Sequence, residues 1–106
     1  GNVEPGARGP QVKEEREPLV DVMDTGKEVV VVTELPGVEK EDIKLESTDR
    51  ALKISVDSAK RRYLKELEMP HMVDPRTAKA TYKNGVLEVR FAKSDEKKPT
   101  RPIPVE

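Results

Sequence analysis

The chain has 106 residues, the size of a single domain with one modest hydrophobic core. Its 20 Lys and Arg residues nearly balance its 21 Asp and Glu residues, and the resulting net charge of −1 gives no overall attraction to nucleic acid or to an anionic membrane. The absence of Cys excludes disulfides and thiolate metal sites, and the absence of Trp with only one Phe and two Tyr excludes a base-stacking surface.

The N-terminal segment is polar. Residues 1–17 contain three Gly, two Pro and a run of mixed charge at positions 13–17, and they form no apolar face. Such a composition buries too little apolar surface to offset the entropy cost of ordering, so we predict a flexible N-terminal arm. Because the chain begins with Gly rather than Met, we also expect a processed or truncated N-terminus.

From residue 18 the pattern is that of β-strands. Residues 19–23 form a short apolar stretch, and residues 28–35 contain four consecutive Val, which suit a strand covered on both faces. Pro36-Gly37 predicts a turn. Residues 43–46 and 52–56 alternate apolar with polar side chains, the period of a strand with one buried face.

The segment at 63–69 is ambiguous. Leu64 and Leu67 fit a short helix, whereas Tyr63, Leu67 and Met69 fit one face of a strand. Pro70 ends the segment and a polar loop at 57–62 precedes it. We favour the strand.

The last strands are predicted to form a hairpin. Asn84-Gly85 is the preferred pair for a type I′ turn, because both central residues need positive φ. It joins a strand at 78–82, reached through a loop at 71–75, to a return strand at 86–91. On the return strand we place Leu87 on the face opposite Val89 and Phe91.

About seven short strands and no segment of helical period predict an all-β fold, an antiparallel immunoglobulin-like β-sandwich. The expected organisation is a flexible arm at 1–17, a sandwich domain at 18–92 and a C-terminal extension at 93–106. That extension is charged and Pro-rich, and it carries the apolar motif Ile103-Pro104-Val105.

Several segments, in this order and at these spacings, resemble the α-crystallin domain of small heat-shock proteins. They are Glu34-Leu35-Pro36-Gly37-Val38, Tyr63-x-Lys65-x-Leu67-x-Met69-Pro70, Ala80-x-Tyr82-x-Asn84-Gly85-Val86-Leu87 and, as the family's I-x-I/V motif, Ile103-Pro104-Val105. The resemblance implies a two-sheet sandwich that dimerises and builds larger homo-oligomers. It also implies a stress-response chaperone that holds unfolding client proteins without ATP or any cofactor. A related CS-type co-chaperone or adaptor, which binds a larger chaperone, is the alternative.

Two features depart from the family pattern. Many bacterial, archaeal and plant members have a long loop between the strands that correspond to 52–56 and 63–69, with an extra strand that is swapped between dimer partners. In this chain only residues 57–62 lie there, too few for such a strand. Dimerisation through the strand at 63–69, as in the animal branch, is the alternative. The polar arm also differs from the usual apolar one, so client capture is expected to be weak or to rest on the groove alone.

The candidate site consists of the motif Ile103-Pro104-Val105 and the groove in which it is expected to dock. Pro104 favours an extended backbone, in which Ile103 and Val105 point the same way and can enter two adjacent pockets. The resemblance places the docking groove at Ile43, Leu45, Ala80 and Tyr82; the alternative is that these are ordinary core residues. The resemblance also makes Arg61, Arg62, Tyr63 and Lys65 possible dimer contacts, with a phosphate-binding patch at 60–62 as the less favoured reading.

Nothing in the sequence predicts an active site. His71 is the only His and, without Cys, cannot build a typical zinc site; we expect an inert loop residue rather than a pH sensor. No base accompanies a Ser nucleophile, and no Gly-rich phosphate motif is present. We therefore expect no enzymatic activity, no catalytic, cofactor-binding or metal-binding residues, no nucleic-acid or membrane partner, and a cytoplasmic location.

Overall fold

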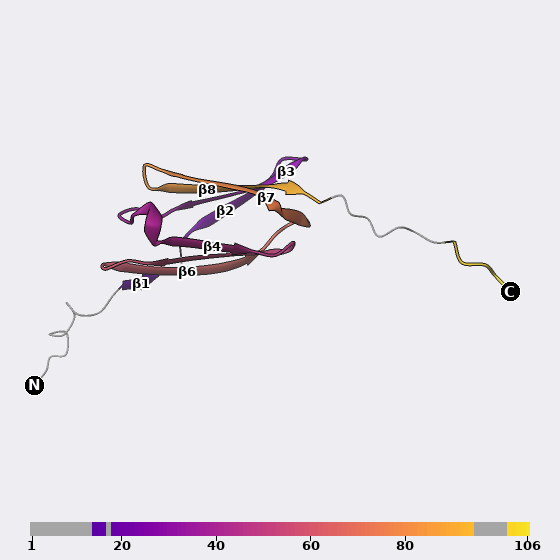
Figure 1. The fold of residues 1–106 in the computed structure, drawn as a ribbon, viewed down its shortest axis with the longest axis horizontal. Helices are drawn as coiled ribbons and strands as arrows, with labels where there is room; N and C mark the ends of the chain where they lie inside the picture. The colour runs from indigo at the N-terminus through magenta and orange to yellow at the C-terminus, as the bar shows by residue number, and fades with distance from the viewer. Residues whose placement is uncertain (1–13, 17, 95–101) are drawn as a thin grey trace, which may run out of the picture.

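Two four-stranded β-sheets stack face to face in the computed structural model, which describes residues 14–16 (backbone only), 18–94 and 102–106 (Figure 1). Sheet A has the order β1-β6-β5-β4 and sheet B the order β2-β3-β8-β7. The elements are β1 (Glu14–Arg16), β2 (Val20–Asp24), β3 (Glu28–Glu34), η2 (Lys40–Asp42, a 3-10 turn), β4 (Ile43–Ser47), β5 (Ala51–Asp57), β6 (Arg61–Glu68), β7 (Val73–Lys83) and β8 (Val86–Lys93).

The predicted antiparallel β-sandwich is confirmed. Strands β2 to β8 are the seven expected strands, and every pairing among them is antiparallel. An eighth strand, β1, lies in the segment predicted as an arm and pairs parallel with the start of β6, from Glu14 opposite Arg61 to Arg16 opposite Tyr63. The proposed domain boundaries stay a prediction.

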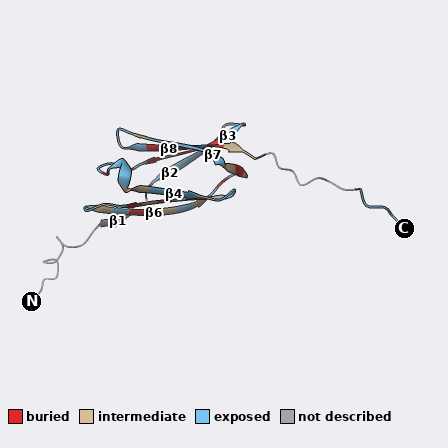
Figure 2. Ribbon diagram, viewed as in Figure 1, coloured by how far each residue is buried: buried red, intermediate tan, exposed pale blue. Residues whose placement is uncertain are grey.

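The hydrophobic core lies between the sheets, where buried positions of facing strands meet (Figure 2). Strand β3 shows why four consecutive Val are needed. Val29 and Val31 are fully buried in the core, while Val30, on the outer face of sheet B opposite Met23 and Arg90, is only 2% exposed. The expectation of a strand covered on both faces is met for these three residues. Core residues are Val29, Val31, Leu35, Val38, Leu52, Ile54, Val56, Tyr63, Met69, Val73, Leu87, Val89 and Phe91.

The predicted hairpin between β7 and β8 is present. Asn84 and Gly85 have φ values of 51° and 78°, as a type I′ turn requires. The Leu35 amide donates to the Gly85 carbonyl at 2.7 Å, which ties this turn to the end of β3. The expected orientation of Leu87 was wrong: Leu87 and Phe91 are buried on the same face as Val89, because positions two apart in a strand share a face.

Residues 61–68 form a strand, so the helical alternative for this segment is wrong. Only residues 58–60 connect β5 to β6, and Ser58 closes the turn. Its hydroxyl accepts from the Arg61 amide at 3.0 Å and its amide donates to the Arg61 carbonyl at 2.9 Å. The connection is thus even shorter than the predicted loop at 57–62.

Strand β7 begins at Val73, inside the loop predicted at 71–75. Pro75 is compatible with the strand because the register shifts between Asp74 and Lys79, which marks a bulge. Thr77 bridges the bulge: its hydroxyl donates to the Asp74 carbonyl at 2.6 Å and accepts from the Ala92 amide at 2.8 Å.

Candidate functional site

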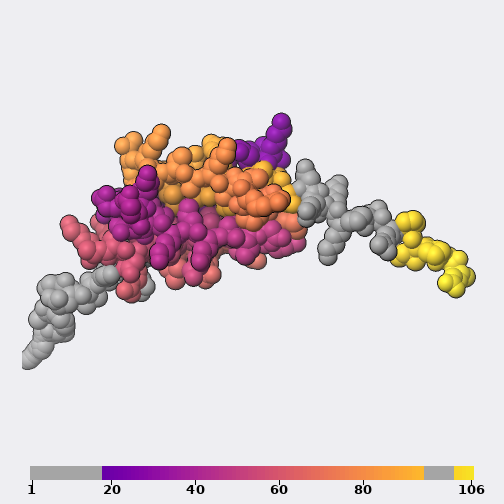
Figure 3. Space-filling view, in the orientation of Figure 1, coloured from indigo at the N-terminus to yellow at the C-terminus, as the bar shows by residue number. Residues whose placement is uncertain are grey.

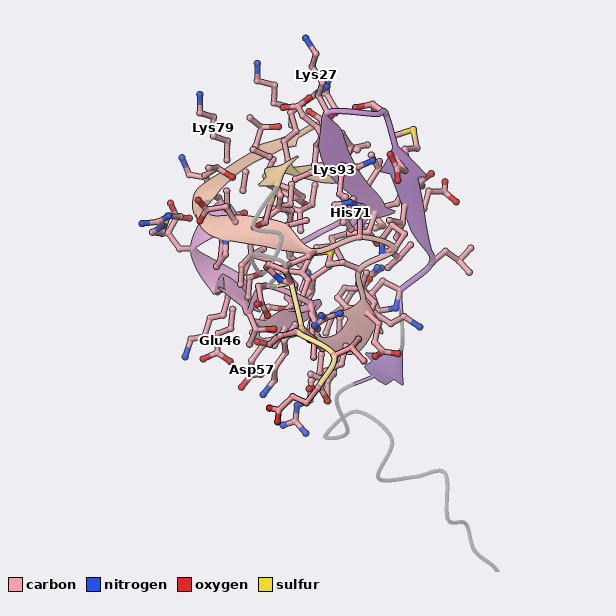
Figure 4. The ribbon with its side chains drawn as sticks, turned by 90° about the vertical axis from the view of Figure 1, so that its right-hand side faces the viewer. Lys27, Glu46, Asp57, His71, Lys79 and Lys93 are labelled. Atoms are coloured by element: carbon pink, nitrogen blue, oxygen red, sulfur yellow. The ribbon has the colours of Figure 1, made fainter. Side chains whose placement is uncertain are left out.

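Strand β4 forms one edge of sheet A and β7 one edge of sheet B, and they lie one above the other on the face of the sandwich shown in Figure 3. In the end-on view of Figure 4, Glu46 of β4 and Lys79 of β7 lie on the same side of the molecule. We call the side of the sandwich along which these two edge strands run the β4/β7 seam. It contains the four residues predicted as a docking groove.

All four predicted groove residues face the space between the sheets. Ile43 and Leu45 lie opposite the buried Val56 and Ile54, and Ala80 and Tyr82 lie opposite the buried Val89 and Leu87. Residues directly opposite each other on paired strands share a face, so these side chains point inward.

Burial of the groove residues is incomplete. Ile43, Leu45 and Tyr82 are partly buried and pack against the core, whereas Ala80 is exposed although it faces inward. Its single methyl group fills little of the seam at the sheet edge. Ile43, Leu45 and Tyr82 therefore pack against the core and still expose part of their apolar surface to solvent.

Tyr82 closes one end of the seam. Its hydroxyl contacts the carbonyl oxygen of Leu35 closely and that of Val38 at 3.2 Å, and its single proton is shared between them. These carbonyls belong to the turn that leads from β3 toward η2 and β4. Tyr82 thus fixes this turn to β7, a contact across 47 residues that the sequence gives no signal for.

The C-terminal motif is uncovered in the single chain. Ile103 is 86% and Val105 97% exposed, more than any described large hydrophobic residue other than Leu19. Both sides of the predicted contact are thus accessible, but docking between them stays a prediction.

The possible dimer contacts lie on β6 and already have partners within the chain. The Arg61 guanidinium donates from Nη1 to the Tyr63 hydroxyl at 3.0 Å and to the Pro36 carbonyl at 3.3 Å. Arg62 is exposed and lies 4.0 Å from Asp57, and Lys65 lies opposite Ile54. A role in dimerisation remains a prediction for these four residues.

A match to the family model described as an HSP20-like domain found in ArsA covers residues 20–91. The chain belongs to the small heat-shock protein family. The 18.1 kDa class I heat shock protein of Arabidopsis thaliana is 32% identical over 97 residues, and the 17.4 kDa class I protein of Oryza sativa subsp. japonica is 29% identical. The matches cover 76% of this chain but 60% and 63% of the plant proteins, so it spans about three fifths of their length.

Solved structures agree with this assignment. Heat shock protein 16.0 from Schizosaccharomyces pombe superposes with a TM-score of 0.70 at 25% identity, covering 91% of this chain and 80% of that protein. A point mutant of hsp14.1 from Sulfolobus solfatataricus P2 gives a TM-score of 0.64 at 26% identity, covering 74% of this chain and 80% of that protein. The resemblance to the α-crystallin domain is therefore confirmed.

The charged clusters of this small heat-shock protein tie its strands together. Lys93 of β8 forms a close ion pair with Asp24 at the end of β2, and this contact, with the Gly26 amide, lowers the pKa of Asp24. Arg90 bridges Glu88 and Glu28 at 3.3 and 3.0 Å, which raises its pKa. Arg76 likewise lowers the pKa of Asp74. Each pair has at least one solvent-exposed partner and is structural.

Other site types receive no support from the described residues. None of them gather into groups of three or more His, Asp or Glu that could hold a metal ion. His71 is exposed, with Nδ1 2.7 Å from the carbonyl oxygen of Met72. No helix in the described part of the chain is long and apolar enough to cross a membrane.

Proposed function

We propose that this small heat-shock protein is an ATP-independent holdase that binds partly unfolded proteins, prevents their aggregation and assembles from dimers. The observation that supports the proposal is that one chain has inward-facing, partly exposed apolar residues along the β4/β7 seam and two uncovered aliphatic side chains, Ile103 and Val105, two residues apart. Contact between copies of the chain would bury the apolar surface of the β4/β7 seam and of Ile103 and Val105 together.

Docking of Ile103 and Val105 into the β4/β7 seam of a second copy follows from simple geometry. In an extended strand, residues two apart project the same way and lie roughly 7 Å apart, as do Ile43 and Leu45 on β4. Full burial of each side chain contributes about 1.5–3 kcal/mol, from which the ordering of the tail must be subtracted. A single contact is therefore weak and reversible, and several contacts in an oligomer reinforce one another.

The charge pattern of β6 supports dimerisation through this strand. In an antiparallel pairing of two copies centred on Leu64, this residue, which is 46% exposed, meets its own copy. Arg62 then faces Glu66 of the second copy on both sides of the two-fold axis, and Lys60 faces Glu68. Facing opposite charges stabilise antiparallel strands. Because β1 occupies the same edge of β6 from Arg61 to Tyr63, it must leave for this dimer to form.

The assembly step is tested by light scattering coupled to size exclusion. Changing both Ile103 and Val105 to Ser should shift the protein to smaller species, while changing Lys97 and Lys98 to Ser in the same tail should not. An unchanged mass for the first variant would contradict docking by the motif.

Holding is tested directly with a heat-denatured client enzyme and no nucleotide. At equimolar subunits the protein should suppress light scattering by the client, and addition of ATP should change nothing. Scattering as high as that of the client alone would refute the holdase proposal.

A further inference from the structure

A cavity lies away from the β4/β7 seam, where the start of β2 and the end of β3 meet β6. It has a volume of about 590 Å³, and we call it the β2 pocket. It is lined by Pro18, Leu19, Val20, Asp21, Val32, Glu34, Pro36 and Tyr63. Five of these side chains are aliphatic or proline and one is aromatic, so the walls are mainly apolar.

One wall of the β2 pocket is apolar surface fixed in an exposed position. Leu19 is 90% exposed, yet its backbone is anchored, because its carbonyl oxygen accepts a 2.7 Å hydrogen bond from the hydroxyl of Thr33, which is only 2% exposed. On the other side, Tyr63 is 3% exposed and fixed by Arg61. A large aliphatic side chain held in water by an ordered backbone is suited to covering by a ligand.

The rim of the pocket is acidic. Asp21 lies opposite Val32, so Glu34, two residues further along β3, is its diagonal neighbour on the outer face of sheet B. Both carboxylates are exposed, and neither has an ion pair or a side-chain hydrogen bond within the described residues. The Arg61 guanidinium, beside Tyr63, donates to the Tyr63 hydroxyl and to the Pro36 carbonyl. The rim therefore offers two uncompensated negative charges.

The edge of β2 beside the pocket is also open. Among the described strands, β2 pairs only with β3, which leaves its other edge available for an added strand. An extended peptide along this edge gains backbone hydrogen bonds and can place alternate side chains in the pocket.

We propose that the β2 pocket binds an extended segment of an unfolding protein in which an aliphatic or aromatic residue stands beside Lys or Arg. The apolar side chain covers Leu19 and Val20, and the cation pairs with Asp21 and Glu34. This inference rests on the proposed holdase function and assigns it a client site separate from the β4/β7 seam. The protein's own tail, with Arg101 near Ile103, has similar chemistry and is the competing occupant.

The test measures fluorescence anisotropy of labelled peptides Lys-Leu-Phe-Leu-Lys and Glu-Leu-Phe-Leu-Glu, with capped ends. The host is the full chain with Ile103 and Val105 changed to Ser, which removes its own tail motif. We expect the lysine peptide to bind at least tenfold more tightly than the glutamate peptide. Asp21→Lys with Glu34→Lys should reverse this preference, and Leu19→Ser should weaken both peptides at least threefold.

The matched control is Glu41→Lys with Glu46→Lys, two exposed carboxylates near β4 that change the net charge by the same amount. An equal loss of lysine-peptide binding in the control, or no change in the rim variant, would overturn the proposal. Thermal melts establish that each variant is folded. If the variant with Asp21→Lys and Glu34→Lys does not fold, Leu19→Ser, at an exposed position, still tests the pocket.

Two further outcomes are decisive. If a peptide of sequence Arg-Pro-Ile-Pro-Val binds with the same dependence on Asp21 and Glu34 and displaces the lysine peptide at lower concentration, the tail is the occupant and the client assignment is wrong. If the unmodified protein suppresses client aggregation but the rim variants bind the peptides normally, the pocket inference fails while the holdase function stands. Absence of suppression by the unmodified protein would instead refute the function itself.

Discussion

The hydroxyl of Tyr82, near the end of β7, lies 3.2 Å from the carbonyl oxygen of Val38 and closer still to that of Leu35. One side chain of sheet B therefore holds the turn that carries the chain across to sheet A. The contact links β7 to the segment that leads into β4, and these two strands border the β4/β7 seam.

Tyr82→Phe keeps the ring packing and removes both hydrogen bonds. Because two partly buried carbonyls lose a donor, we expect the free energy of unfolding to fall by about 1–2 kcal/mol. Urea denaturation followed by circular dichroism measures this change. Thr81→Ala, an exposed neighbour on the same strand, is the control and should stay within about 0.5 kcal/mol of the unmodified protein. Equal stability of the two variants would contradict the role of the hydroxyl.

Gly85→Val tests the hairpin. Gly85 has a φ of 78°, where a β-branched residue is strained, and a Cβ there would lie 3.5 Å from the Cα of Pro36. The 3.5 Å approach is an ordinary contact, so the positive φ is the source of strain, and we expect a loss of about 1–3 kcal/mol. Gly85→Asn, which tolerates positive φ, should lose less. A thermal melt that is the same for the Val and Asn variants would show that the backbone conformation matters little.

Local patterns account for what the sequence predicted well. Three signals act through neighbouring residues: the Val run, the period-2 segments and Asn84-Gly85. The strands, the hairpin and the inward orientation of Ile43 and Leu45 could therefore be predicted from the sequence. Strand β7 starts earlier than predicted because Thr77 stabilises a bulge around Pro75, which propensity alone does not reveal.

The remaining features depend on contacts between distant segments. The Tyr82 hydrogen bonds join residues 44 and 47 positions apart, and the Arg61 contact with Pro36 joins residues 25 apart. The β2 pocket likewise brings Leu19 and Pro36 to Tyr63. No pattern of residue spacing predicts these long-range contacts, because they depend on how the two sheets stack.

The Asp24 and Lys93 pair predicts an acid-dependent contribution to stability. The pKa of Asp24 is lowered by Lys93 and the Gly26 amide, so the contribution is present above the unfolded-state pKa of about 3.9 and is lost as pH falls through the lower folded-state pKa. Asp24→Asn should thus lower the melting temperature at pH 6, and the difference should vanish in strong acid. Asp21→Asn, which removes an exposed carboxylate without a partner in the described chain, is the control and should leave the melting temperature at pH 6 unchanged. A constant difference for Asp24→Asn across pH 2–6 would argue against the linkage.

A charge swap tests dimerisation through β6. In the pairing centred on Leu64, Arg62 faces Glu66 of the second copy twice, so Arg62→Glu alone or Glu66→Arg alone places like charges opposite each other and should weaken the dimer at least fivefold. The double variant restores both attractions and should recover the dimer. Because Arg62 also lies 4.0 Å from Asp57 within the chain, Asp57→Asn is the control and should leave the dimer unchanged. Dissociation constants from analytical ultracentrifugation, in protein whose Ile103 and Val105 are changed to Ser, isolate this contact from tail docking. Failure of the double variant to recover, while both single variants dissociate, would place Arg62 and Glu66 in other contacts and contradict this register.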